Sequence, residues 1–498
     1  MSKISKQQLQ SYLWESANIL RGKIDSGDFK HYILGLLFYK RLSDVFDEEF
    51  QKLKEQVGEE LALDKSLYAD VFFIPAGCHW NDILSTSTNI GAKINDVFAE
   101  VTRANAPRLD GILDKIDFND KDKLSDAAMS DLVNHFNVHK LGNEFITGDM
   151  LGDAYEYLIA QFADDAGKKG GEFYTPHQIV ELLVEILQPQ EGQSIYDPAC
   201  GSGNFLVIAF KEMCRLEIEI YKRLKELDSN NWLILKSAIL LTQFCGIEKD
   251  DYAHEAAKLS LWIAEHQMNI FFNEVFGETK PTLPLSLSAK IICDNAVQID
   301  WNKFCPKTKD EIIFVIGNPP YKGARRQTVD QKKDMTNLFS VINNYKSNLD
   351  YVGCWFFKAV NYINKNNAQV AFVSVNSICQ GEQVEILWPD IFKNNIEIGF
   401  AYLPFKWTNS AKGNAGVFCV IINLRAKSNK DKFIYNEDER KHVKNINPYL
   451  VEGKNIIINS SNKPISDLSP IVFGSTPNDG GNLILSDIEK IDLINSFP

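Results

Sequence analysis

The tetrapeptide Asn318-Pro319-Pro320-Tyr321 constrains the fold and the chemistry of this chain more than any other stretch. It directly follows an apolar run over 312–317, whose length and composition predict a buried strand. Two consecutive prolines cannot continue a helix or a sheet, so the chain must turn just past the strand. An amide, a rigid carbonyl and an aromatic ring are thereby placed at the carboxyl edge of a sheet, where open α/β sheets bind ligands.

These three groups suit a planar amine on a heterocycle. The Asn318 carboxamide and the Pro319 carbonyl can each accept a hydrogen bond, and the Tyr321 ring can stack on the heterocycle. Enzymes that act on a nucleic-acid base flip it out of the duplex and bind it through such contacts. A turn that merely ends a strand is the plain alternative, because turns are rich in Asn and Pro.

Length, charge and cysteine content bound the remaining possibilities. A chain of 498 residues with 45% hydrophobic residues predicts several globular domains. The net charge of −13 gives no support to nucleic-acid binding and indicates that another chain supplies phosphate contacts. We expect no membrane span and no signal region. The nine scattered cysteines lack a Cys-x-x-Cys pair, which predicts reduced thiols, a cytoplasmic location and no zinc site.

Residues 1–150 predict an N-terminal helical domain. Leu9, Leu13, Ala17 and Leu20 recur at helical spacing, and a second amphipathic stretch covers about residues 29–53. The region contains no pattern of a metal-dependent nuclease and no His/Glu metal pattern, so we expect no metal ion. A contact with a partner chain or with DNA is the expected use of this domain.

Residues 151–425 alternate strands with helices and predict a doubly wound, Rossmann-like α/β sheet. Ahead of the first strand, a glycine- and lysine-rich loop ends in Phe173, Tyr174, Thr175 and Pro176, which reads as an exposed loop or an ordinary linker leading into a helix.

Polar residues follow the strands predicted at 194–197, 244–248 and 291–293. The first strand ends in Asp197 and leads through a Gly-x-Gly turn into a helix over about 205–224; glycines permit a tight turn and close approach of a ligand. The second strand ends in Glu248, after a helix predicted over 233–239, and this acid suits a ribose diol or caps the next helix. The third leads into Asp294 and Asn295, which form a turn or meet a ligand amine.

Two further segments near the tetrapeptide carry candidate contacts for phosphates or for a base. Lys322, Arg325 and Arg326 form the most basic segment there, as a solvated loop or as phosphate contacts. A polar loop over 404–414 contains Phe405 and Trp407, which can stack on a base. Residues 426–498 predict a partial α+β segment, which we interpret as the incomplete start of a target-recognition domain.

Together these motifs resemble those of S-adenosylmethionine-dependent DNA adenine-N6 methyltransferases. Asp197 to Leu206 resembles the cofactor motif, Asn318 to Tyr321 resembles the catalytic motif, and Gly171 to Pro176 resembles the extra cofactor motif that precedes it. Residues 1–160 resemble modification subunits of type I restriction–modification systems. From Asn318 onward the chain resembles single-chain type IIL enzymes, although it shows no signature of the N-terminal nuclease that those enzymes carry.

The resemblance implies the site residues, the cofactor and the partners. The implied catalytic residues are Asn318, Pro319, Pro320 and Tyr321, with Tyr321 stacking on a flipped adenine of double-stranded DNA. The implied S-adenosylmethionine contacts are Phe173, Tyr174, Thr175, Pro176, Asp197, Ala199, Gly201, Gly203, Asn204, Phe205, Glu248, Asp294 and Asn295. A specificity subunit and a restriction subunit are the further partners that the resemblance implies.

Two other functions stay open at this stage. Methyltransferases that act on glutamine amides or RNA bases use the same tetrapeptide, and cytosine N4 fits the same acceptors as adenine N6. A non-catalytic or truncated methylase-like subunit for DNA binding or assembly is the alternative from a different class.

Overall fold

The computed structural model describes residues 5–21, 26–68, 71–106, 109, 113, 117–121, 124–146, 157, 175–227, 237–277, 289–305, 312–340, 348–406, 417–461, 463, 466–467, 469 and 484–496. Of the predicted site residues, Phe173, Tyr174 and Trp407 lie outside these ranges. The chain divides into two compact units, residues 1–457 and 458–498.

The N-terminal region is helical, as predicted. Helix α1 (Lys6–Leu20) begins with a capping box, in which Ser5 and Gln8 each bond the other's backbone N–H. The four apolar residues predicted to share one face of α1 are all fully buried. They pack with the apolar face of the long helix α2 (Ser26–Val57) in one core. Further helices of this region are α3 (Glu59–Ala62), η1 (Lys65–Leu67), α4 (Trp80–Leu84), α5 (Ile90–Ala104) and α6 (Asp126–Phe136).

A sheet of nine strands, counted within the described residues, follows in the order β3-β2-β1-β4-β5-β7-β6-β8-β9. Strands β1 to β5 pair in parallel, β7 is antiparallel to both β5 and β6, β6 pairs with β8 in parallel, and β8 pairs antiparallel with β9. The strands are β1 (Ser194–Asp197), β2 (Phe244–Glu248), β3 (Lys290–Cys293), β4 (Ile313–Gly317), β5 (Ala368–Val375), β6 (Ile396–Lys406), β7 (Phe418–Ala426), β8 (Lys432–Tyr435) and β9 (Arg440–Val443). The predicted doubly wound α/β sheet is therefore confirmed.

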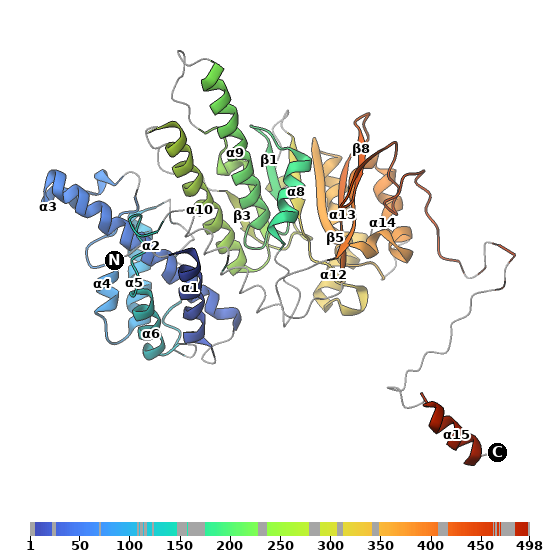
Figure 1. Cartoon of the computed structure of the whole chain (residues 1–498), viewed down its shortest axis with the longest axis horizontal. Helices are drawn as coiled ribbons and strands as arrows, with labels where there is room; N and C mark the ends of the chain where they lie inside the picture. The colour runs from blue at the N-terminus through green and yellow to red at the C-terminus, as the bar shows by residue number, and fades with distance from the viewer. Residues whose placement is uncertain are drawn as a thin grey trace. The chain divides into compact units, whose positions relative to one another are not determined.

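Helices cover both faces of the sheet (Figure 1). One core contains residues of α8 (His177–Leu187), α9 (Asn204–Leu227) and α10 (Asp251–Phe276). The opposite core contains residues of α11 (Trp301–Phe304), α12 (Val329–Phe339), α13 (Gly353–Ile363), η4 (Asn376–Cys379) and α14 (Gly381–Lys393). The short helices η2 (Leu241–Gln243) and η3 (Ala324–Arg326) lie in connections, and α15 (Asp487–Ser496) belongs to the second unit.

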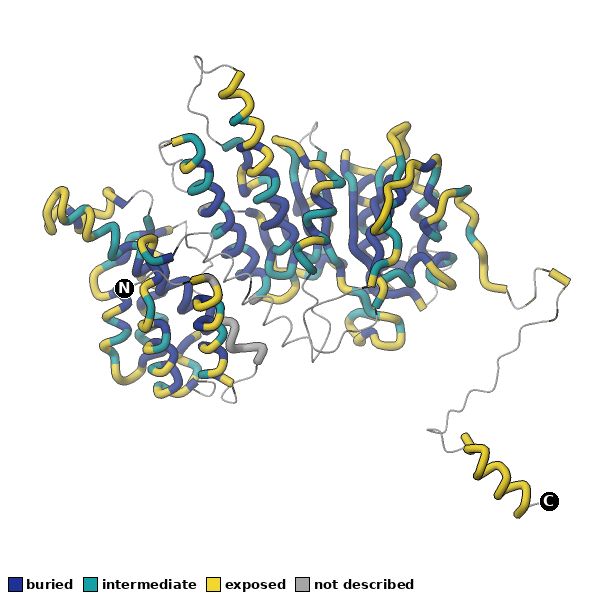
Figure 2. Tube along the Cα trace, in the orientation of Figure 1, coloured by how far each residue is buried: buried dark blue, intermediate teal, exposed yellow. Residues whose placement is uncertain are grey.

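Side chains of the central strands alternate between these two cores. In β4, Phe314 and Ile316 belong to the core with α8, α9 and α10, whereas Ile313 and Val315 belong to the opposite core. This period of two is the reason that a continuous apolar run folds as a strand buried on both faces. Figure 2 shows the resulting concentration of buried residues along the strands.

Two local predictions from the sequence were wrong in the described residues. The end of the helix predicted over 233–239 is not helical, because the Ala238 N–H and the Ser237 hydroxyl both donate to the Glu217 carboxylate, at 2.6 Å each. Phe405 lies in strand β6 rather than in a loop, since it pairs with Cys419 of β7. Among the described helices, none combines the length and the apolar character needed to cross a membrane.

Candidate active site at the carboxyl edge of the sheet

The candidate site lies where the strand order of the sheet reverses. β1 lies between β2 and β4, and the chain proceeds outward from it on one side to β3 and on the other side to β5. In open α/β sheets, ligands bind outside the carboxyl ends of the strands at such a reversal. Asp197 ends β1, Glu248 ends β2, and Asn318 directly follows β4. The structure thus brings the three predicted residues to one edge of the sheet.

The Gly-x-Gly turn needs glycine at both positions. Gly201 and Gly203 have φ angles of 54° and 88°, in the left-handed region that side chains rarely adopt. A Cβ on Gly203 would also lie 3.1 Å from the Cα of Ala257 on α10. The two predicted residues that follow differ: Asn204 is half-buried at the start of α9, whereas Phe205 is buried in the core.

Asp197 is a fully buried carboxyl at this turn. Its Oδ1 accepts a hydrogen bond of 2.9 Å from the half-buried Ala199 N–H. Its Oδ2 is buried and has no hydrogen-bond partner within the described residues. Burial raises the pKa of Asp197 to about 8, and Glu248 adds to the shift while the Ala199 N–H opposes it. Asp197 also needs Gly317 beside it, because a Cβ there would lie 2.4 Å from Oδ1.

Glu248 links the Gly-rich turn to the end of β2. Its carboxylate accepts hydrogen bonds from the backbone N–H groups of Gly201 at 2.9 Å, Lys249 at 2.7 Å and Asp250 at 2.8 Å. Burial raises the pKa of Glu248, although these three donors oppose the shift. Asp250, rather than Glu248, caps helix α10 through the Ala253 N–H. The alternative that Glu248 caps this helix was therefore wrong.

The Asn318 side chain contacts the segment that precedes the Gly-rich turn in sequence. Its Nδ2 donates to the Thr175 hydroxyl at 3.1 Å. The Thr175 carbonyl in turn accepts a hydrogen bond of 2.7 Å from Asn204 Nδ2. The Asn318 Oδ1 is buried and has no hydrogen-bond partner in the described part of the chain. An acceptor oxygen is thus held at the site without a donor, next to the turn predicted to bind the cofactor.

The rest of the tetrapeptide surrounds this amide. Pro319 is buried and Pro320 is exposed, while the Tyr321 hydroxyl lies 3.6 Å from the Cys419 Sγ of β7. Burial raises the pKa of Tyr321 far above its ordinary value, so the phenol stays protonated. Phe405 pairs with Cys419 across β6 and β7 and packs in the same core as Tyr321. It is therefore the one predicted aromatic contact of the DNA whose described position lies near Tyr321.

Pro176, Asp294 and Asn295 were also predicted to contact the cofactor. Pro176 is half-buried at the N-terminus of α8, and Asp294 is exposed just past β3, with its N–H bonded to the Glu248 carbonyl at 2.8 Å. The Asn295 amide is engaged within the protein: Nδ2 donates to Asp334 at 2.9 Å and Oδ1 accepts from Val297 N–H at 3.0 Å.

The basic segment after Tyr321 is held by a buried clamp. Asp350 accepts the Lys322 N–H at 2.9 Å, and Gln327 donates to the Lys322 carbonyl at 3.1 Å. Arg325 and Arg326 lie on η3 with exposed side chains. Within the described residues, no ion pair neutralises Lys322 or either arginine.

Cys419, Asp350 and Gln327 were missed in the sequence. Cys419 is 98 residues from Tyr321, and Asp350 is 28 residues from Lys322. None of the three stands in a motif, so only their tertiary contacts place them at the site.

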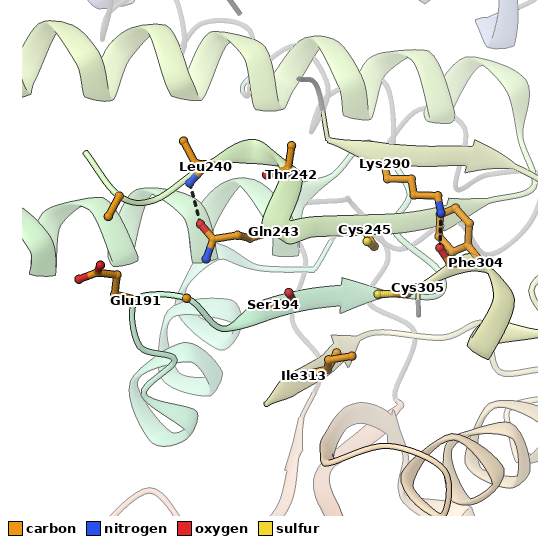
Figure 3. A pocket seen from close by; sticks show the side chains of 12 residues that line it. Glu191, Ser194, Leu240, Thr242, Gln243, Cys245, Lys290, Phe304, Cys305 and Ile313 are labelled. Atoms are coloured by element: carbon orange, nitrogen blue, oxygen red, sulfur yellow. Dashed lines mark hydrogen bonds between the residues drawn. The ribbon is translucent and has the colours of Figure 1, made fainter. Parts of the chain in front are cut away.

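A cavity of about 430 Å³ lies at the opposite edge of the sheet (Figure 3). It opens at the amino ends of β1 to β4, where the Lys290 Nζ stands 4.8 Å from the centre of the Phe304 ring. No residue predicted to bind a ligand lines this cavity. Its lining residues are Glu191, Gly192, Ser194, Ala238, Leu240, Thr242, Gln243, Cys245, Lys290, Phe304, Cys305 and Ile313.

One group of side chains has the composition of a metal site. Asp251, His254 and Glu255 on α10 place their ligand atoms within 4.8 Å of one another, and His254 Nε2 lies 3.2 Å from the Ile291 carbonyl. No predicted site residue belongs to this group.

Comparison with family models identifies the chain. Residues 175–436, more than half of its length, match the MmeI DNA-methyltransferase domain. The chain belongs to this family. Residues 9–136 match the HsdM N-terminal domain, and residues 452–498 match the MmeI target recognition domain. The predicted combination of a type I-like N-terminus with a type IIL-like remainder is confirmed.

Curated relatives support the same family. DNA methyltransferase A of Bacillus subtilis (strain 168) is 49% identical over 305 residues, which cover 61% of this chain and 34% of that protein. The type I restriction enzyme MjaIX methylase subunit of Methanocaldococcus jannaschii is 26% identical over 425 residues, which cover 80% of this chain and 66% of the subunit. The chain therefore spans between about a third and two thirds of these two relatives.

Among solved structures, the type IIL restriction-modification enzyme MmeI in complex with DNA superposes with a TM-score of 0.69 at 29% identity. The match covers 99% of this chain and 68% of MmeI. The type I methyltransferase subunit from Streptococcus thermophilus shares the fold, with a TM-score of 0.59 at 20% identity, over 87% of this chain and 88% of that one. Membership of a methyltransferase family implies the use of S-adenosylmethionine.

Proposed function

We propose that this chain transfers a methyl group from S-adenosylmethionine to N6 of a flipped adenine in DNA, as the modification component of a restriction–modification system. One observation carries the proposal: the buried Asn318 Oδ1 is an acceptor without a donor, placed beside the Gly-rich turn. A buried polar atom without a partner costs free energy, and the position of this one beside the Gly-rich turn favours a ligand that donates to it. Family membership and the similarity to a DNA methyltransferase support the same reaction.

The residues present fit the cofactor. The Asp197 Oδ2 is buried without a partner among the described residues, and a carboxylate there would pair with the ammonium of the methionine moiety. The Gly-x-Gly turn leaves backbone open to a ligand, and Glu248 at the end of β2 would accept the ribose hydroxyls. S-adenosylmethionine supplies, when bound, a methyl group activated by a sulfonium.

The chain would act on the target amine by position rather than by acid–base chemistry. The lone pair of adenine N6 delocalises into the ring, which makes the amine a poor nucleophile. Asn318 Oδ1 and the Pro319 carbonyl would accept its two hydrogens out of the ring plane and favour a pyramidal nitrogen. As the new N–C bond forms, the sulfur–methyl bond breaks, and the surplus N6 proton then leaves to solvent. Orientation of this kind accounts for large rate factors.

We place the DNA contacts at the same edge of the sheet. Tyr321 and Phe405 would stack on the flipped base, and Lys322, Arg325 and Arg326 would bind phosphates. The residues at this edge do not account for recognition of a target sequence. Because relatives of the chain are methylase subunits of type I restriction enzymes, we include a specificity subunit and a restriction subunit among the proposed partners.

The test is transfer of labelled methyl to unmethylated genomic DNA, followed by base analysis of the product, for the wild type, Asn318→Ala and the control Asn134→Ala. Asn134 is an exposed amide on α6. We expect N6-methyladenine from the wild type and the control. Asn318→Ala should lose at least about a hundredfold in rate with cofactor affinity nearly unchanged.

Three outcomes would contradict the proposal. Methylation retained by Asn318→Ala would exclude the catalytic role of the amide. Transfer to RNA or to protein glutamine instead of DNA, or a product of N4-methylcytosine, would reassign the substrate. Absence of cofactor binding in the wild type would favour a non-catalytic subunit.

A further inference from the structure

Thr175 forms hydrogen bonds with two motifs of the candidate site, the tetrapeptide that begins at Asn318 and the Gly-rich turn that Asn204 follows. It is buried, with 5% of its surface exposed, just before helix α8. Its hydroxyl accepts the hydrogen bond from Asn318 Nδ2, across 143 residues of sequence. Its carbonyl accepts the hydrogen bond from Asn204, the residue that follows the Gly-x-Gly turn. The two motifs are thus joined through one side chain and one carbonyl of the same residue.

The direction of the Asn318 carboxamide decides whether this site can hold an amine. A carboxamide has one acceptor end and one donor end of nearly equal size, so a half-turn about the last side-chain bond exchanges them. An amine substrate needs the acceptor end. With Nδ2 on the Thr175 hydroxyl, Oδ1 is left as the buried atom without a partner.

The Tyr321 hydroxyl supports the same direction. A hydrogen bond from the Asn318 side chain opposes the rise in the pKa of Tyr321 that burial and Cys419 cause. In this direction the amide nitrogen is used within the protein, and its oxygen is available to a ligand.

We propose that Thr175 is a positioning residue that fixes the Asn318 carboxamide with its oxygen toward the methyl-accepting amine. This inference rests on the proposed function and goes beyond a contact of Thr175 with the cofactor. Because Asn204 holds the Thr175 carbonyl, the position of Thr175 depends on the Gly-rich turn. A displaced turn therefore misorients the catalytic amide, so cofactor site and amine site are coupled through Thr175.

The test compares Thr175→Val, which keeps the branched shape and loses the hydroxyl, with Thr175→Ser, which keeps the hydroxyl. Thr86→Val is the matched control, because the Thr86 hydroxyl bonds the Asp82 carbonyl in the helical region. The readouts are the single-turnover rate of methyl transfer at saturating cofactor, the cofactor Kd and the melting temperature. Thr175→Ala serves as a second hydroxyl-free variant if Thr175→Val does not fold.

We expect Thr175→Val to lower the single-turnover rate by about tenfold to a hundredfold, the size of effect that misplaced reacting groups produce. Its cofactor Kd should stay within about twofold, since Thr175→Val removes only the hydroxyl bonded to Asn318 and keeps the carbonyl that holds Asn204 beside the Gly-rich turn. Thr175→Ser should restore most of the rate, and Thr86→Val should match the wild type.

Each contrary result overturns the inference in a distinct way. An unchanged rate in Thr175→Val removes the role of the hydroxyl. A higher cofactor Kd in Thr175→Val, with an unchanged rate of methyl transfer at saturating cofactor, would mean that Thr175 only contacts the cofactor. An equal loss in Thr175→Ser assigns the effect to packing. The wild type separates these from failure of the proposed function: if it methylates no DNA, the function falls, whereas an active wild type with an equally active Thr175→Val overturns only the role of Thr175.

Discussion

Asp197 is fully buried, yet the proposed contact with the cofactor ammonium requires its carboxylate to be charged. Burial holds the pKa of Asp197 at about 8, so the carboxyl is mostly protonated at pH 7. Its ordinary pKa is 3.8, and the folded chain therefore keeps a proton that the unfolded chain releases. This contribution to the free energy of unfolding is complete below the ordinary pKa and is lost as the pH rises through about 8.

A cation that pairs with Asp197 should displace that proton. We expect cofactor binding at pH 7 to release close to one proton from wild type, and Asp197→Asn to release none, because an amide has no proton to lose. Calorimetric titrations in two buffers of different ionisation enthalpy count the protons. Equal proton release by both proteins would show that Asp197 stays protonated and does not pair with the cofactor.

At the level of elements, the turn η3 projects its two arginines from a fixed base. The Asp350 and Gln327 side chains fix the backbone of Lys322 on both its N–H and its carbonyl. Asp350 is buried, and burial raises its pKa while the N–H groups of Val352 and Lys322 oppose the shift. These hydrogen bonds hold the backbone between Tyr321 and η3, the element that carries Arg325 and Arg326.

Replacing Arg325 and Arg326 with Ala should weaken DNA binding and its dependence on salt. Each phosphate contact that is lost reduces the slope of log K against log salt by about 0.9. Arg223→Ala is the control, because Arg223 pairs with Glu226 at the exposed C-terminal end of α9, about a hundred residues before Arg325. Fluorescence anisotropy at several salt concentrations measures the slopes. An unchanged slope in the double variant would place the phosphates elsewhere.

On the scale of the whole molecule, the described residues of the second unit add no core to the chain. Every described residue from 458 to 496 is exposed, including all of α15 (Figure 2). The same residues fall within the match to the MmeI target recognition domain. Stability and cofactor binding are therefore expected to depend on residues 1–457, and DNA selection on the second unit.

Deletion of residues 458–498 tests this division. We expect the free energy of unfolding to change by less than about 0.5 kcal/mol, since every described residue that is removed is exposed, and the cofactor Kd to stay the same. DNA affinity should fall, together with any preference between target sequences. Chemical denaturation, cofactor titration and binding to a pool of random duplexes provide the three readouts. A large loss of stability would mean that the second unit packs on the first.

The sequence alone determined strands β1 to β4 and the polar residues that follow them. Buried strands appear as apolar runs, and glycine and proline mark the turns after them, so Asp197, Glu248 and Asn318 could be placed at strand ends. These signals are local. The wrong assignments were local too: Phe405 joins β6 because β7 pairs with it, and Ser237 and Ala238 leave the helix because Glu217 binds them.

Only the tertiary structure decided how those strand ends meet. The contacts of Asn318 with Thr175 and of Tyr321 with Cys419 join residues 143 and 98 positions apart. Such contacts depend on strand order and helix packing, which no local propensity encodes. The high pKa of Asp197 has the same origin, because its desolvation comes from neighbours gathered by the fold. The sequence therefore identified the candidate groups of the site, whereas packing determined their orientation, their hydrogen-bond partners and their protonation.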